Sequence, residues 1–182
     1  MTFSIQNFEH EKILLLLTES RDLKITHMHV VKEMTRRRYH LVLITATLPY
    51  SVLSKVYDRE GIDMRMIRVI DLVTLYSGGS ISVPGTACRF LPNPGNLTSI
   101  GIAVTDILNE VSGSKVCLVF DEVSTMLLYA PSITISKFFH FLSSKLRIRD
   151  DNGIFLAVER GIDPTLLAQL STFVDRVVPS SE

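Results

Sequence analysis

The 182-residue sequence contains nine glycines, and none of them lies in the first sixty residues; the first is Gly61. A phosphate-binding loop needs glycine in the turn between an early strand and its helix, because backbone N–H groups must approach the phosphates closely. The opening strand and helix of this chain therefore carry no glycine-rich phosphate loop of either common kind.

The sequence also has no charge excess, only two cysteines and no long hydrophobic run. Nineteen Lys and Arg residues balance nineteen Asp and Glu residues, and a zero net charge argues against nucleic-acid binding. Two cysteines are too few for a disulfide framework. No apolar run approaches the roughly 20 residues of a membrane span, and residues 1–7 contain no signal-peptide core. We expect a reduced cytoplasmic protein with no membrane segment.

The mean hydropathy of +0.27 is explained best by a buried parallel sheet. Short apolar runs predict strands at 12–18, 41–45, 66–70, 116–120, 154–158 and 173–178. Apolar residues at helical spacing predict helices at 22–38, 49–61, 97–113, 135–153 and 164–170. Residues 77–95, rich in glycine, proline and serine, are expected to form a long loop or hairpin. The alternation predicts one three-layer α/β domain over residues 1–182, with a mainly parallel central sheet.

The predicted strand at 116–120 runs directly into Asp121 and Glu122. In nucleotide-binding folds, an apolar strand ending in this way is a Walker B strand, whose aspartate holds the Mg²⁺ shell. Many buried strands also end in a carboxylate that caps the next helix. The strand alone leaves both interpretations open.

Three segments around this strand are more specific: NLTSIGIA at 96–103, LVFDEVSTMLLY at 118–129 and FFHFL at 138–142. Together they resemble the KaiC-like branch of the RecA superfamily, a largely archaeal group described as implicated in signal transduction. The resemblance covers nearly the whole chain. It implies a RecA-like core of the P-loop NTPase type, which binds ATP and Mg²⁺ and often assembles into rings or dimers.

The first half of the chain departs from that family where phosphate would bind. The family's Walker A segment falls on TESRDLKIT at 18–26, so that Lys24 takes the position of the phosphate-binding lysine. Ile25 stands where a Mg²⁺-binding hydroxyl belongs, and Thr26 comes one position late. Every glycine of the motif is replaced. The resemblance therefore implies a degenerate Walker A motif.

Acidic residues in the same segment add to this departure. Glu19 and Asp22 place negative charge where phosphates would dock. If Asp22 caps the following helix, its side chain satisfies the free N–H groups and the positive end of the helix dipole. We therefore expect this loop to be filled from within the chain.

The residues after the second strand also differ from the family. KaiC-like ATPases usually carry two glutamates there to activate the attacking water, whereas this chain has Thr47 and Leu48, which are not general bases near neutral pH. Glu122 is the remaining candidate for a catalytic base, because a glutamate beside the Walker B aspartate serves in other ATPase branches. Without a phosphate cradle, Glu122 has no γ-phosphate to act on.

These observations favour a vestigial nucleotide site made of Lys24, Thr26 and Asp121, with Asp121 as the candidate Mg²⁺ ligand. The leading hypothesis is a non-hydrolysing regulatory or scaffolding domain that contacts a protein partner or itself and needs no cofactor. The alternative is an ATP-dependent regulator that uses Lys24, Asp121 and Glu122 in an unconventional site.

A third hypothesis, nucleic-acid binding, rests on the run Arg36, Arg37 and Arg38. The simpler interpretation is a helix C-terminus, where cations complement the helix dipole. A zinc site is not expected, because His27 and His29 lie two positions apart on a helix and face different directions.

Overall fold

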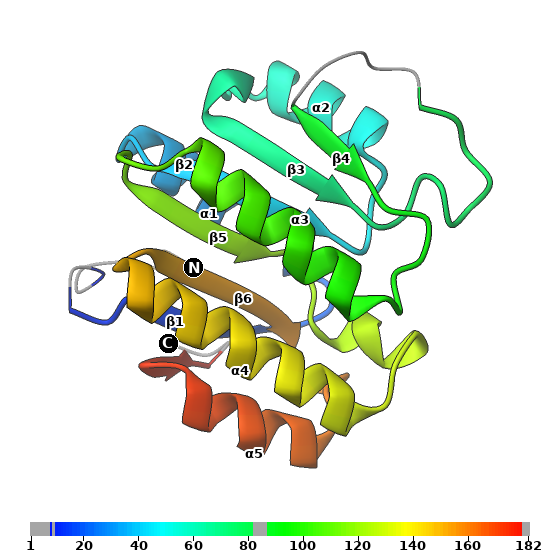
Figure 1. Cartoon of the computed structure of the whole chain (residues 1–182), viewed down its shortest axis with the longest axis vertical. Coiled ribbons are helices and arrows are strands. Elements are labelled where there is room, and N and C mark those ends of the chain that lie inside the picture. The colour runs from blue at the N-terminus through cyan, green and yellow to red at the C-terminus, as the bar shows by residue number, and fades with distance from the viewer. Residues whose placement is uncertain (1–7, 9, 82–86, 180–182) are drawn as a thin grey trace.

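The computed structural model describes residues 8, 10–81 and 87–179; residues 1–7, and residues 82–86 of the predicted loop, lie outside this part of the chain (Figure 1). Its strands are β1 (Ile13–Thr18), β2 (His40–Thr45), β3 (Ile67–Asp71), β4 (Cys88–Phe90), β5 (Val116–Phe120), β6 (Asn152–Val158) and β7 (Arg176–Val178). Its α-helices are α1 (Leu23–Arg36), α2 (Tyr50–Arg59), α3 (Leu97–Glu110), α4 (Ser132–Arg149) and α5 (Pro164–Phe173). Short 3₁₀ helices form at η1 (Met64–Met66) and η2 (Ser124–Leu128).

The strands form one sheet in the order β4-β3-β2-β5-β6-β1-β7, and every pair is parallel. Helices α3, α4 and α5 cover one face, while α1 and α2 cover the other (Figure 1). Crossover helices on both faces are what a parallel sheet requires. The predicted three-layer α/β architecture with a mainly parallel sheet is confirmed.

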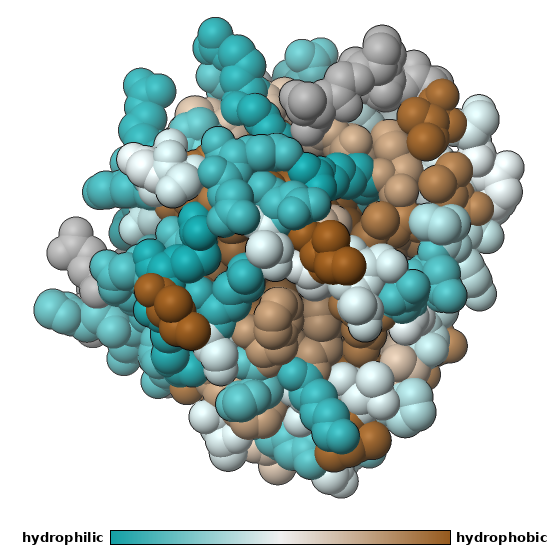
Figure 2. Space-filling view, viewed as in Figure 1, coloured by the Kyte–Doolittle hydropathy of each residue, from teal (hydrophilic) through white to brown (hydrophobic). Residues whose placement is uncertain are grey.

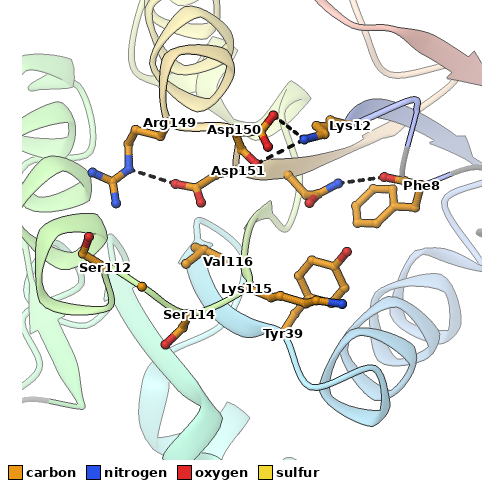
Figure 3. A pocket seen from close by; sticks show the side chains of 12 residues that line it. Phe8, Lys12, Tyr39, Ser112, Ser114, Lys115, Val116, Arg149, Asp150 and Asp151 are labelled. Atoms are coloured by element: carbon orange, nitrogen blue, oxygen red, sulfur yellow. Dashed lines mark hydrogen bonds and ion pairs between the residues drawn. The ribbon is translucent and has the colours of Figure 1, made fainter.

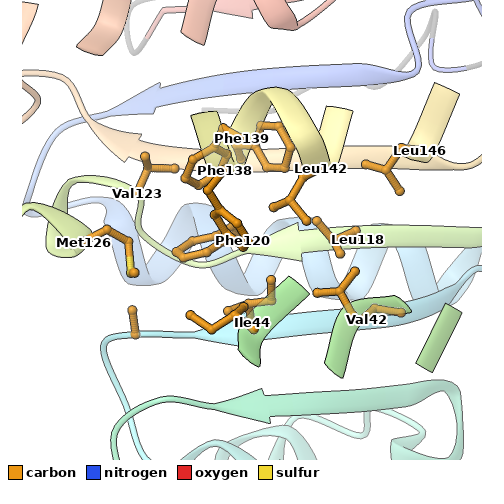
Figure 4. Close-up of a cluster of buried hydrophobic side chains, with 14 of the residues drawn as sticks. Val42, Ile44, Leu118, Phe120, Val123, Met126, Phe138, Phe139, Leu142 and Leu146 are labelled. Carbon is orange, nitrogen blue, oxygen red and sulfur yellow. The ribbon is translucent and has the colours of Figure 1, made fainter. Parts of the chain in front are cut away.

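The central strands are buried on both faces, which explains their continuous apolar sequences. On the face covered by α3 and α4, Phe139 packs against Phe120 (Figure 4). Phe155 packs against the same ring. Cys117 is fully buried on the opposite face, and burial raises the pKa of its thiol. Within the described residues, no helix combines the length and the apolar character needed to cross a membrane.

The prediction for residues 77–95 is wrong at Cys88–Phe90, which form the edge strand β4. This strand pairs in parallel with β3, placing Cys88 beside Val69, whereas a hairpin would pair antiparallel. Three residues are too few to show a period-two pattern, and the surrounding glycines and prolines resemble loop sequence. The pairing with β3 stabilises this strand, and the local sequence does not predict it.

Helix α1 ends at Arg36, earlier than the predicted Arg38. Arg38 has a left-handed backbone with φ of 65°, and the N–H of Tyr39 donates to the carbonyl of Met34 at 3.0 Å. These contacts define a Schellman motif, in which glycine is the usual left-handed residue. Gly61 ends α2 with the same motif, and a glycine there predicts the end of the helix from sequence. An arginine at the left-handed position does not.

Candidate functional site

Three buried carboxylates lie where strands end at the carboxyl edge of the sheet. Asp71 is the last residue of β3, and Asp121 and Glu122 follow β5 directly. All three are at most 5% exposed. In open parallel sheets this edge is where ligands usually bind, so the bonding of these carboxylates decides what the site can do.

Asp121 accepts hydrogen bonds from the loop between β2 and α2. The N–H groups of Ala46 and Thr47 donate to it at 2.9 and 3.3 Å, and the Thr47 hydroxyl donates at 2.6 Å. The Thr45 hydroxyl lies 2.8 Å from Asp121 Oδ2 and also 2.8 Å from the Leu48 carbonyl. Both carboxylate oxygens are therefore engaged by donors of the chain itself.

Glu122 also accepts four hydrogen bonds, from the η2 segment and from β6. Its Oε1 accepts from the N–H groups of Ser124 at 2.9 Å and Val158 at 3.2 Å. Its Oε2 accepts from the N–H and the hydroxyl of Thr125. Glu122 therefore fixes the start of η2 against the end of β6, and no oxygen of its carboxylate is left to orient a water molecule.

Asp71, which the sequence analysis did not select, holds the start of α2. It accepts from the N–H of Tyr50 at 2.7 Å, from the N–H groups of Val73 and Thr74, and from the Thr74 hydroxyl at 2.6 Å. A carboxylate at a helix N-terminus also interacts favourably with the helix dipole. Like Asp121, Asp71 follows an apolar strand, and this shared pattern was the signal available in the sequence.

The turn after β1 differs from the expected filled loop. Asp22 is the N-cap residue of α1, but its side chain makes no capping hydrogen bond, so the predicted capping by Asp22 is wrong. Its backbone lies in the αR region, unlike the extended backbone of most N-caps, and its carboxylate lies 3.7 Å from Arg21. The Thr26 N–H donates to the Asp22 carbonyl at 2.8 Å, and within the described residues the N–H groups of Leu23, Lys24 and Ile25 find no acceptor.

The predicted nucleotide-site residues are only partly brought together. Lys24 and Asp121 line one groove between α1 and α2. The Thr26 hydroxyl instead lies 3.2 Å from the Thr18 hydroxyl. The Glu122 carboxylate accepts a hydrogen bond from the N–H of Val158, the last residue of β6. Since β6 separates β1 from β5, the ends of these two strands lie roughly 10 Å apart, or two strand spacings.

The α1–α2 groove has a volume of about 380 Å³. Its apolar lining is formed by Leu23, Met28, Leu48, Val52, Leu53 and Val56. Its polar lining is formed by Lys24, His27, Thr47, Tyr57 and Asp121. This groove was not predictable from sequence, because its two walls come from helices that are adjacent only in the fold.

His27 and Tyr57 join α1 to α2 beneath the groove. The Nε2 atom of His27 lies 2.5 Å from the Tyr57 hydroxyl, and both side chains are buried. Burial lowers the pKa of His27, an effect that the charge of Asp121 partly opposes. Burial also raises the pKa of Tyr57. The pair is therefore neutral near pH 7.

The lowered pKa of His27 predicts a pH-dependent stability. In the unfolded chain His27 has an ordinary pKa near 6.5, so acidification protonates the unfolded state first and destabilises the fold. We expect the free energy of unfolding to fall between pH 7 and pH 5, by up to about 1.4 kcal/mol per pH unit below 6.5. Urea unfolding of the wild type and His27→Gln at both pH values measures this. The same pH dependence in both proteins would contradict the prediction.

The arginine run at the end of α1 is largely paired within the helix. Arg36 and Arg37 contact the same carboxylate, that of Glu33, at 2.8 and 2.7 Å. The Arg36 hydrogen bond is the main reason that the pKa of Glu33 falls to about 2. Metal-ligand side chains do not cluster in groups of three or more anywhere in the described ranges.

A second hollow, of about 490 Å³, lies at the opposite edge of the sheet (Figure 3). Its charged groups pair with one another: Lys12 contacts Asp150, and Arg149 contacts Asp151 at 2.8 Å. Lys115 lies 6.0 Å from the ring centroid of Tyr39. The first two contacts join the amino ends of β1 and β6 to the end of α4.

Three structures from the archaeon Pyrococcus horikoshii share this fold, each at 13% sequence identity. The KaiC-like protein PH0186 aligns with a TM-score of 0.62 over 91% of this chain and 69% of its own. PH0321, solved in complex with an unknown peptide, aligns with a TM-score of 0.65 over 92% and 76%. PH0250 aligns with a TM-score of 0.61 over 94% and 82%. The chain thus has a KaiC-like, RecA-like α/β fold.

Residues 13–179 match DUF7504, described as a family of unknown function. The match spans most of the 182 residues, so the chain belongs to this family. No curated protein matches the sequence significantly.

Proposed function

We propose that this chain is a KaiC-like domain without ATP hydrolysis, which acts as a regulatory or scaffolding protein through contacts with a protein partner or with another copy of itself. The observation that carries the proposal is the bonding of Asp121 and Glu122. Four donors approach each carboxylate within the chain. Each oxygen of Glu122 already accepts two bonds, so activating water there would require a bond to break, at the cost of leaving a half-buried donor unpaired.

The sequence of the turn after β1 supports the same proposal. On this view, residues 18–26 are a degenerate Walker A motif that lacks glycine, and Ile25 is exposed where a Mg²⁺-binding hydroxyl would be needed. A nucleoside triphosphate would lack the close backbone approach that glycine permits. Glu19 and Asp22 pair with Arg21, so Lys24 would be the one unpaired cation of residues 18–26 for several phosphate charges.

Exposed apolar surface supports a role in protein contacts. A groove of about 360 Å³ between α3 and α4 is lined by Leu97, Gly101, Phe138 and Phe141, and Ile102 at its rim is 58% exposed (Figure 2). Contiguous exposed apolar surface often marks a protein–protein contact. PH0321, which shares the fold, was solved with a bound peptide, so a scaffold of this kind is compatible with peptide contacts.

Thermal unfolding with Mg·ATP tests the proposal. A ligand at a hundred times its Kd stabilises a protein by roughly 2.7 kcal/mol, which raises the Tm of a chain this size by about 5–10 °C. At 5 mM Mg·ATP, any site with a Kd of about 50 µM or tighter would reach this level. We expect no such increase. An increase that Lys24→Ala removes, and that the matched surface variant Lys55→Ala retains, would overturn the proposal.

A second candidate function, ATP binding without a conventional phosphate loop, is favoured by one observation. The N–H groups of the first three residues of α1 lack acceptors within the described residues, and the exposed Lys24 is one of these residues. Free N–H groups and a cation are suited to an anion. The Mg·ATP experiment separates the two functions, because only this second one gives a Tm increase that depends on Lys24.

A further inference from the structure

The α1–α2 groove exposes apolar surface that the chain does not cover. Leu23, Met28, Leu48 and Val56 are each only half-buried, and Val52 is 42% exposed. The groove volume of about 380 Å³ falls within the range of small-molecule sites. Since contact with an apolar ligand would remove this surface from water, the lining favours a hydrocarbon occupant.

The polar groups of the groove are bonded to one another, with one exception. Asp121 is held by the β2–α2 loop, and His27 is bonded to Tyr57. The lowered pKa of His27 keeps that pair neutral near pH 7. Lys24 is exposed, and its ammonium has no hydrogen-bond or ion-pair partner among the described residues.

The acidic residues near Lys24 are directed elsewhere. Glu19 lies 2.9 Å and Asp22 lies 3.7 Å from the guanidinium of Arg21. The groove therefore has one unpaired cation beside an apolar lining. An occupant that complements it has one negative charge and an apolar body.

We infer that the α1–α2 groove binds a small amphipathic carboxylate, with its hydrocarbon chain along the apolar lining and its carboxylate beside Lys24. This site goes beyond the proposed function and does not depend on it. A nucleotide fits less well, because the groove lining offers only one lysine or arginine for several phosphate charges. A linear carboxylic acid satisfies both features of the groove.

The experiment is an NMR titration of the ¹⁵N-labelled protein with hexanoate, octanoate and decanoate. We expect saturable shifts of α1 and α2 residues, with a Kd that decreases about fourfold for each added methylene. Increasing the salt concentration should weaken binding, because the ion pair with Lys24 is exposed. Absence of saturable binding at 10 mM decanoate, or shifts confined to other surfaces, would overturn the proposal.

Two variants with matched controls test the contribution of each part. Lys24→Ala should weaken octanoate about twofold to fivefold and leave 1-octanol unchanged, whereas Lys55→Ala should affect neither. Val52→Trp should fill the groove and weaken both ligands at least about tenfold, while Ile25→Trp, at an exposed position of α1 outside the groove, should not. Equal loss of octanoate and 1-octanol in Lys24→Ala would overturn the assignment of the carboxylate, and full binding by a folded Val52→Trp would overturn the site.

Mg·ATP provides the comparison with the nucleotide hypothesis. Shifts of the groove residues at a lower concentration of Mg·ATP than of decanoate would overturn the carboxylate assignment. Octanoate binding without any response to Mg·ATP is the expected result. Failure of octanoate to bind leaves the proposed protein-contact function intact, so the two proposals fail separately.

Discussion

Replacing Asp121 with alanine is expected to lower the free energy of unfolding by about 3–4 kcal/mol. The substitution leaves the buried N–H of Ala46 and the donors of Thr47 without their acceptor, while the Thr45 hydroxyl keeps the Leu48 carbonyl; each unpaired buried group costs about 1–3 kcal/mol. The β2–α2 loop also loses the contact that fixes it to β5. Urea unfolding measured at pH 7 gives the difference directly.

The matched control is Asp58→Ala, which removes an exposed carboxylate from α2 and should change stability by no more than about 0.5 kcal/mol. Asp121→Asn keeps the side-chain shape and one acceptor oxygen, and is expected to be less destabilising than alanine. If Asp121 serves chiefly to bind a metal, its removal should be nearly neutral in metal-free buffer. A loss below about 1 kcal/mol in Asp121→Ala would therefore contradict its structural role.

Phe139→Ala is expected to destabilise the protein by about 3–5 kcal/mol, because it removes a large buried ring and leaves a cavity. Phe139 is fully buried, and its ring centroid lies 4.9 Å from that of Phe155 and 5.1 Å from that of Phe120 (Figure 4). These rings come from α4, β6 and β5, so the cavity would weaken the packing of α4 against the central strands. Equilibrium unfolding in urea measures the loss.

Phe141→Ala, on the same helix, is the control for this prediction. Phe141 is 42% exposed and lies in the α3–α4 groove, so its truncation should cost less than about 1 kcal/mol. Equal losses at the two positions would show that the aromatic core in Figure 4 is not the main support of α4.

The central strands and the layer arrangement were predictable from sequence, because their residues follow simple physical patterns. Leu41–Thr45 and Val116–Phe120 are apolar on both faces, as strands of a covered parallel sheet must be. In the sequence, helices with one buried apolar stripe lie between such strands. This alternation of strands and helices predicts the layered α/β architecture. Strand β4 was not predicted, because its formation depends on pairing with β3 and its own three residues carry no strand pattern.

The candidate site was less predictable, because it depends on hydrogen bonds between distant segments. Asp22 has the residue type of a helix cap, yet its αR backbone leaves the side chain without that role. The sequence placed Asp121 correctly at the end of a strand, but its bonds to residues 45–47 depend on β2 lying beside β5. The contact between His27 and Tyr57 depends in the same way on α1 packing beside α2.

Release of phosphate from Mg·ATP by the purified wild-type protein at pH 7 tests whether this domain hydrolyses ATP. If Asp121 and Glu122 are held by the chain's own donors, release should equal that of a protein-free sample, and Lys24→Ala should give the same value. Turnover by the wild type that Lys24→Ala abolishes, while Lys55→Ala retains it, would show a working ATPase site and contradict the account.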